Sequence, residues 1–355
     1  MHPWVFVAYI SHISRKQLIL YGCLLIILFC YVFTSFGDSV PRSFYPIYGG
    51  GSQLCLDGDL HGTKYDSGLG NVLFEVIAFL AVANKTNRIP VLSNRKSIRH
   101  IEKFVPHLPN MGSVISTSKD TSICAPVVKY VEFSTDCCRV DLTGINEINR
   151  YNGSVVAHTF YTQGIAYLSM LPKSTVLSLS QGSPDVVGIA KNKLFEKDKR
   201  RGKKKNLCVH TRRGDFLESP LVYPSNEIFA REATKFVYEK EGNFSHIYIF
   251  GNDITFLKGV YHGWIDTSIA GENKAFPPNV EFEFSRLYCD TVLITSSAST
   301  YGWWIGYLSR GQTVYYNNNF SRPGGIDTQM DRKQFFPSHW IPLDLITTIQ
   351  IGQAL

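Results

Sequence analysis

The chain has 355 residues, of which 13% are aromatic and 18% charged, and its formal net charge is +7. This composition is typical of a folded protein and excludes a largely disordered one. Nine basic and two acidic residues between Lys191 and Lys205 account for the whole charge excess, and residues 197–205 contain no aromatic side chain, so we expect no nucleic-acid partner.

The first element is an uncharged run of nineteen residues, Leu18 to Phe36. Such a run can span about 30 Å of hydrocarbon at about 1.5 Å per residue. Arg15 and Lys16 precede it, and residues 1–17 contain no acidic side chain, which predicts a cytosolic tail (1–17), a transmembrane signal anchor (18–36) and a luminal body. A cleaved signal peptide is the alternative, because Ser35-Phe-Gly37 is a possible cleavage region.

Residues 37–52, rich in proline and glycine, are expected to form a stem. After it, the pattern predicts a strand at 53–56, an apolar helix at 71–83 and a strand at 88–92. The middle of the chain has weaker signals, with short strands predicted at 127–133, 154–158 and 175–179. We assign 53–190 to an N-terminal Rossmann-like domain and 191–205 to an exposed basic linker.

From Leu207 onward, strands and helices alternate. Strands are predicted at 207–211, 247–250, 291–295 and 313–316, and helices at 227–241, shortly after 253, at 282–289 and at 300–309. This alternation predicts a parallel sheet with helices on both faces, which we assign to a C-terminal nucleotide-sugar-binding domain at 206–345.

Three of these strands end in polar segments: Arg212-Arg-Gly-Asp215, Gly251-Asn-Asp253 and Ser296-Ser-Ala-Ser-Thr300. Ligands of open α/β sheets bind beyond the carboxyl ends of the strands. Guanidinium groups pair with phosphate oxygens, and helix starts favour anions. The segments therefore predict a site for a phosphorylated ligand such as a nucleotide diphosphate, with surface ion pairs and helix capping as the alternative.

His210-Thr-Arg-Arg-Gly-Asp215 resembles the HxRRxD signature shared by α1,2-, α1,6- and protein O-fucosyltransferases, and its Gly-Asp form is most similar to the α1,2-fucosyltransferases, glycosyltransferase family 11. Gly68-Leu-Gly-Asn71 and the block from Thr295 to Tyr315 are similar to two further segments of that family. Thr211 and the Ser-Ser-Ala-Ser run depart from the family pattern, which indicates a divergent member.

The resemblance implies a GT-B-like α/β fold, in which two Rossmann-like domains face a cleft. It implies an inverting transfer of L-fucose from GDP-fucose to a galactose hydroxyl of a glycan, in α1,2 linkage. It also implies a single-pass type II protein of the Golgi membrane with a luminal catalytic body. The alternatives are a protein O-fucosyltransferase, another nucleotide-sugar transferase, or a membrane-anchored glycan-binding pseudoenzyme. An adhesion role for Arg213-Gly-Asp215 is less favoured, because the tripeptide follows a buried strand.

Several residues are candidates for the site. Arg212 is expected to bind phosphate and stabilise the transition state, and Asp215 and Glu218 are candidate bases, with salt-bridge or capping roles as alternatives. The expected donor-binding residues are His210, Arg212, Arg213, Asp253, Ser297, Ser299 and Thr300. Gly70 and Asn71 are expected on the acceptor or fucose side, with helix capping as the alternative for Asn71.

In an extended strand, His210 and Arg212 point to one side, and Thr211 and Arg213 to the other. A structural pair between Arg213 and Asp215 is therefore an alternative to a shared role of the two arginines. No metal is expected: Asp57-Gly-Asp59 has a suitable spacing but lies outside the phosphate segments, and fixed guanidinium groups can supply the positive charge.

The cysteines fit the secretory pathway. Cys137 and Cys138 are expected to pair with distant partners rather than with each other, and Cys208 to be a free apolar residue in its strand. Four sequons make Asn84, Asn152, Asn243 and Asn319 candidate N-glycosylation sites, of which Asn84 is the least favourable because it ends a predicted helix.

Overall fold

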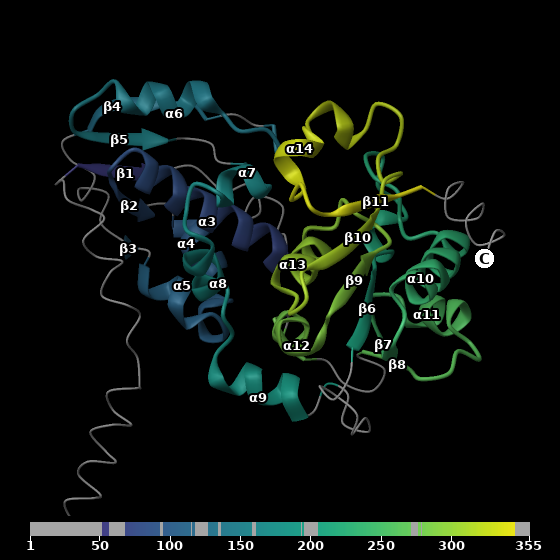
Figure 1. The fold of residues 1–355 in the computed structure, drawn as a ribbon. Helices are drawn as coiled ribbons and strands as arrows, with labels where there is room; N and C mark the ends of the chain where they lie inside the picture. The colour runs from purple at the N-terminus through teal and green to yellow at the C-terminus, as the bar shows by residue number, and fades with distance from the viewer. Residues whose placement is uncertain are drawn as a thin grey trace, which may run out of the picture. The chain divides into compact units, whose positions relative to one another are not determined.

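A computed structural model (Figure 1) describes residues 52–56, 68–92, 95–114, 116–117, 127–133, 136–157, 161–192, 194, 205–270, 276–277 and 279–344. The expected tail, signal anchor, most of the stem, most of the basic linker and the Asp57-Gly-Asp59 segment lie outside these residues. Within the described part of the chain, no helix is long and apolar enough to cross a membrane.

The N-terminal half is built on a five-stranded parallel sheet. Its strand order is β3 (Ser116–Thr117), β2 (Ile89–Leu92), β1 (Gln53–Leu56), β5 (Ser154–Ala157) and β4 (Val127–Val131). Helix α3 (Leu69–Lys85) connects β1 to β2, and 14 of its 17 residues are buried. A helix that is apolar on all sides must lie in the interior, and α3 shares one hydrophobic core with Leu54 and Leu56 of β1.

Short helices fill the rest of this half: α4 (Arg95–Glu102), α5 (Pro109–Val114), α6 (Leu142–Asn149), α7 (Ile165–Leu168), α8 (Lys173–Leu179) and α9 (Pro184–Asn192). The strand predicted at 175–179 is wrong, because these residues belong to α8. Thr175, Val176 and Leu179 are the buried residues of α8, a spacing that fits one face of a helix. Tertiary packing therefore overrides the β-propensity of this short segment.

The C-terminal half is built on a six-stranded parallel sheet. Its order is β11 (Ile341–Leu343), β10 (Thr313–Asn317), β9 (Thr291–Ile294), β6 (Lys205–Thr211), β7 (Phe244–Gly251) and β8 (Thr267–Ile269). Figure 1 shows α10 (Glu227–Glu241) and α11 (Ile254–Val260) on one side of this sheet, and α12 (Val280–Tyr288) and α13 (Thr300–Leu308) on the other. The two parallel sheets confirm the predicted α/β, GT-B-like fold class.

Side-chain alternation along β6 explains this doubly covered sheet. Leu207 and Val209 lie in the core that includes α10 and α11. Cys208, between them, points to the opposite face and lies in the core that includes α12 and α13. The strand is therefore apolar on both faces, as buried strands of parallel sheets are.

The cysteine predictions are wrong in two places. Cys208 is not free: it forms a disulfide with Cys289, and their Cα atoms are 5.6 Å apart. Cys137 and Cys138 form a disulfide with each other. Cys137 lies in a turn, so the two neighbouring side chains do not point to opposite sides as they would in a strand.

The four sequons differ in exposure. Asn152, Asn243 and Asn319 are exposed and lie outside helices and strands, whereas Asn84 is half-buried in the last turn of α3. Thr86, the third residue of the Asn84 sequon, is buried, and its hydroxyl donates to the carbonyl of Val82 at 2.8 Å. Glycosylation at all four positions remains a prediction.

Candidate active site

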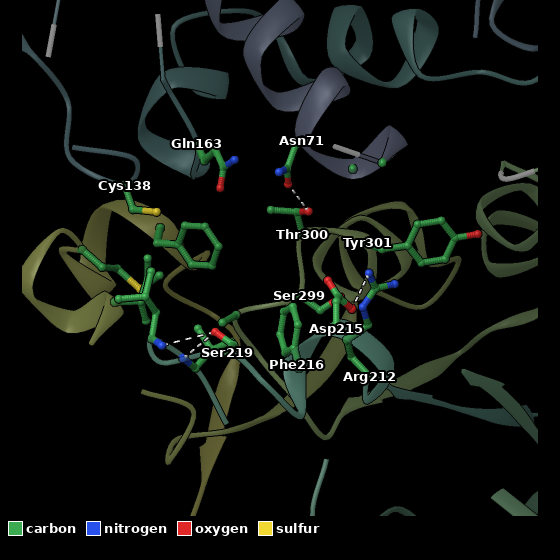
Figure 2. A pocket seen from close by; sticks show the side chains of 18 of the residues that line it. Asn71, Cys138, Gln163, Arg212, Asp215, Phe216, Ser219, Ser299, Thr300 and Tyr301 are labelled. Carbon is green, nitrogen blue, oxygen red and sulfur yellow. Dashed lines mark hydrogen bonds and ion pairs between the residues drawn. The ribbon is translucent and has the colours of Figure 1, made fainter. Parts of the chain in front are cut away.

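A cavity of about 680 Å³ lies beyond the carboxyl ends of β6 and β9 (Figure 2). Residues from both halves of the chain line it. The N-terminal half contributes Gly68, Gly70, Asn71, Cys138, Tyr161 and Gln163. The C-terminal half contributes Arg212, Asp215, Phe216, Ser219, Leu221, Val222, Ala298, Ser299, Thr300, Tyr301, Ile326, Met330 and Phe335.

Strand β6 positions the guanidinium group of Arg212 at this cavity. It follows the last strand residue, and its Nη2 lies 2.9 Å from Oδ1 of Asp215. Its guanidinium carbon is 5.6 Å from the centre of the Phe216 ring. The Nε atom is buried and has no hydrogen-bond partner among the described residues. A positioned guanidinium with an unpaired N–H group is suited to bind an anion.

His210 lies behind Arg212 on the same side of the strand. It is buried, and its ring centre is 6.0 Å from that of Tyr301. Burial, followed by the nearby charge of Arg212, lowers the pKa of His210 to about 3, so the imidazole is neutral at physiological pH. Its Nδ1 atom is buried and makes no hydrogen bond within the described part of the chain.

Tyr301, whose ring lies near His210, forms a hydrogen bond with Glu281, and both residues are half-buried. Burial raises the pKa of Glu281 to about 7, and a hydrogen bond with Tyr301 acts in the opposite direction. Burial, and then Glu281, raise the pKa of Tyr301 well above its ordinary value, whereas Arg212 lowers it. Tyr301 is therefore a neutral hydroxyl group at physiological pH.

The first turns of α3 and α13 meet at the cavity. A side chain at Gly70 would lie 2.7 Å from the backbone nitrogen of Tyr301, so the close approach requires glycine. The indole Nε1 of Trp304 donates to the Gly70 carbonyl at 3.0 Å. The hydroxyl of Thr300 donates to Oδ1 of Asn71. We call these contacts the α3–α13 junction.

Three of the predicted residues at this junction have defined local roles. Ser299 is the N-cap of α13, and its hydroxyl accepts from the Gly302 N–H at 3.3 Å. Thr300 and Asn71 bond to each other rather than to their own backbones. The capping alternative for Asn71 is wrong, because the N-cap of α3 is Gly68.

Arg213 points away from this cavity, as period-two alternation requires. Its Nε lies 3.0 Å from Oδ2 of Asp253, and its guanidinium is 4.4 Å from the centre of the Phe256 ring. It lines a different cavity of about 990 Å³. The alternative of a pair between Arg213 and Asp215 is wrong: Asp215 pairs with Arg212, and Arg213 pairs with Asp253.

The remaining candidates lie outside the Arg212 cavity. Asp253 caps α11, since its Oδ1 accepts from the Phe256 N–H at 3.0 Å, while its other oxygen binds Arg213. Ser297 is buried and donates to the Ile294 carbonyl at 3.3 Å. Glu218 is exposed and does not line the cavity. Of the two candidate bases, Asp215 is the one that the structure places in the cavity wall.

Thirteen of the nineteen cavity residues were not among the sequence candidates, including Phe216, Tyr301 and Gln163. Phe216 directly follows the arginine motif, and Tyr301 directly follows Thr300, so proximity to those motifs could have indicated both. Gln163 lies in the weakly patterned middle of the chain, and no sequence signal indicates it. Among the described residues, no group of three His, Cys, Asp or Glu side chains could hold a metal ion.

Together, fold and cavity define an α/β protein that presents a guanidinium and two helix starts to an anionic ligand, with a neutral imidazole buried behind the guanidinium. No known family profile matches the chain. Three Caenorhabditis elegans proteins are similar to it in sequence. The first, svh-11, is provisionally named a galactoside 2-α-L-fucosyltransferase and is 30% identical over 78% of this chain and 76% of its own length.

The other two are named galactoside 2-α-L-fucosyltransferase. One is 27% identical over 78% of this chain and 74% of its own length. The other is 28% identical over 79% of this chain and 78% of its own length. The chain therefore belongs to the galactoside 2-α-L-fucosyltransferase family, and it is a fucosyltransferase.

Solved structures show weaker likenesses. A mutant of Arabidopsis thaliana FUT1 in complex with GDP has a TM-score of 0.46 and 11% identity over 81% of this chain and 72% of its own. The α-1,6-fucosyltransferase NodZ soaked with GDP-fucose has a TM-score of 0.40 and 12% identity, over 73% of this chain and 93% of its own. Both TM-scores are below 0.5, so the family assignment rests on the sequence relatives.

Proposed function

We propose that this fucosyltransferase moves L-fucose from GDP-fucose to a galactose hydroxyl of a glycan, in α1,2 linkage and with inversion at the fucose anomeric carbon. The observation that carries the proposal is Arg212, whose buried Nε is unpaired among the described residues in a cavity between two helix starts. The names of the sequence relatives support the galactoside acceptor and the linkage.

The reaction breaks the bond between the fucose anomeric carbon and the diphosphate oxygen, while the acceptor hydroxyl attacks that carbon and loses its proton. Negative charge grows on the departing diphosphate. Arg212 and the positive ends of α3 and α13 would stabilise that charge, because they are fixed before the reaction begins. Asp215 is our candidate for the base, and its ion pair also orients Arg212.

The test is transfer of labelled fucose from GDP-fucose to a panel of glycosides and proteins, with the product linkage determined by NMR. We expect a Fucα1-2Gal product from β-galactosides. Transfer only to serine or threonine of a folded protein would contradict the proposal and identify a protein O-fucosyltransferase.

Metal removal is expected to leave the activity largely unchanged. We propose that the guanidinium of Arg212 supplies the positive charge that a divalent cation would otherwise bring to the diphosphate. The initial rate should be measured with and without EDTA at a fixed GDP-fucose concentration. Complete loss of activity that Mn²⁺ restores would assign this charge stabilisation to a metal instead.

We also propose that the enzyme is a single-pass type II protein of the Golgi membrane. The uncharged run from Leu18 to Phe36 and the preceding Arg15 and Lys16 motivate this orientation. In sealed microsomes, the catalytic body should resist added protease until detergent is present. Digestion of the C-terminal body in intact vesicles would reverse the proposed topology.

A further inference from the structure

The Arg212 cavity has two chemically different ends. Figure 2 shows Arg212, Asp215 and Tyr301 on one side, Cys138 and Ser219 on the other, and Phe216 between them. The end away from Arg212 is largely apolar. Its wall includes Leu221, whose carbonyl accepts from the Ile326 N–H at 3.1 Å, and Cys138, which forms a β-bridge with Met330.

Gln163 is a polar side chain at the apolar end. Figure 2 shows its amide directed into the cavity. The residue is 4% exposed, and its Nε2 atom has no hydrogen-bond partner in the described part of the chain. A buried amide N–H group without a partner is unfavourable, so this geometry indicates a group that a bound ligand satisfies.

The backbone holds Gln163 firmly in this position. Its N–H donates to the Cys137 carbonyl at 2.7 Å. The next residue, Gly164, has a φ of +119°, and a side chain there would lie 2.7 Å from the Gln334 carbonyl oxygen. The backbone at Gln163 therefore does not need to be ordered by the ligand, which favours binding.

The loop that carries Phe216 is also fixed. The Arg212 N–H donates to the Ser225 hydroxyl at 2.8 Å, and the Arg213 N–H donates to Oδ1 of Asn252 at 2.9 Å. The Phe216 ring is half-buried and stands between the two ends of the cavity. It presents an apolar surface beside the phosphate-binding end.

We propose that Gln163 donates a hydrogen bond to a ring hydroxyl of the acceptor sugar, while Phe216 packs against the apolar face of that sugar. A galactopyranose has this dual character, because C–H groups gather on one face and hydroxyl groups stand at its rim. The inference rests on the proposed function, since it assigns the donor to the Arg212 end and the acceptor to the Gln163 end. Gln163 is then an acceptor-specificity residue.

The test compares Gln163→Leu with Thr162→Val. Thr162 is the adjacent residue, is fully buried and also has an unpaired side-chain oxygen among the described residues, but it does not line the cavity. Gln163→Leu should raise the acceptor KM roughly tenfold or more and leave the KM for GDP-fucose unchanged. Thr162→Val should change neither value. Gln163→Met provides a second apolar replacement in case the leucine variant does not fold.

A series of monodeoxy acceptors identifies the hydroxyl. The wild-type enzyme should discriminate against one of them, and Gln163→Leu should lose that discrimination, as a double-mutant cycle requires. An unchanged acceptor KM, or a rise confined to the KM for GDP-fucose, would overturn the assignment of Gln163.

The acceptor panel should include β-glucosides and N-acetylglucosaminides. The acceptor KM of the Gln163→Leu enzyme should be measured with whichever glycoside the wild-type enzyme fucosylates. Transfer to a non-galactoside would therefore overturn the proposed acceptor class while the comparison of the Gln163 and Thr162 variants still decides the inference.

Discussion

Arg212→Lys should lower kcat by on the order of 10²–10³ while leaving the melting temperature unchanged. Lysine keeps the positive charge but loses the planar set of donors, which includes the buried Nε at the cavity wall and the Nη2 paired with Asp215. Because the diphosphate gains charge as the bond breaks, the loss should fall on kcat rather than on the KM for GDP-fucose alone.

Arg231→Lys is the matched control for this substitution. Arg231 lies on α10, its side chain is 44% exposed, and it pairs with Glu227 on the surface. The same chemical change there should leave kcat unaffected, because exposed ion pairs contribute little. Near-normal turnover of the Arg212→Lys enzyme would show that Arg212 is a scaffolding residue and that the phosphate site lies elsewhere.

Gly70→Ala should reduce kcat/KM by about 10²-fold, because a misplacement of about 1 Å at a catalytic centre has effects of that size. The added methyl group would lie 2.7 Å from the Tyr301 nitrogen and 2.8 Å from the Thr300 hydroxyl oxygen. The α3–α13 junction must open to accept it, which moves Asn71 and Thr300 apart. Steady-state kinetics with both substrates measure the effect.

Gly188→Ala controls for the general effect of replacing a helical glycine. A methyl group at Gly188 in α9 would meet nothing within 4 Å, so this substitution should be neutral or slightly stabilising. If Gly70→Ala matched Gly188→Ala in activity, the junction would be free to adjust and would not position the site.

The sequence predicts the C-terminal half better than the N-terminal half. Strand β6 and helix α10 carry clear patterns, and the predicted helix at 227–241 agrees with α10 at both ends. The Asn226 side chain caps this helix by accepting from the Phe229 N–H, which is a local signal. Segment 173–179 has no comparable signal, and its helical state depends on packing against residues distant in sequence.

The site was only partly predictable for a related reason. Strand alternation correctly predicted that Arg212 and Arg213 face opposite sides, but the motif does not show which side holds the cavity or that Arg213 pairs with Asp253. Ion-pair partners depend on the turn after β6, which the pattern Arg-Arg-Gly-Asp does not specify. Gln163 could not be found at all, because an unpaired amide becomes visible only when its surroundings are known.

The α3–α13 junction also has a consequence for biosynthesis. Asn71 and Thr300 are 229 positions apart, so α3 leaves the ribosome long before α13 exists. At about 5–20 residues per second, the interval is roughly ten to fifty seconds. During this time Phe74, which packs against Trp303 and Trp304 in the finished protein, lacks both aromatic partners. We therefore expect the nascent N-terminal half to expose an aggregation-prone apolar surface. Chaperone protection in that interval should govern the yield of folded enzyme.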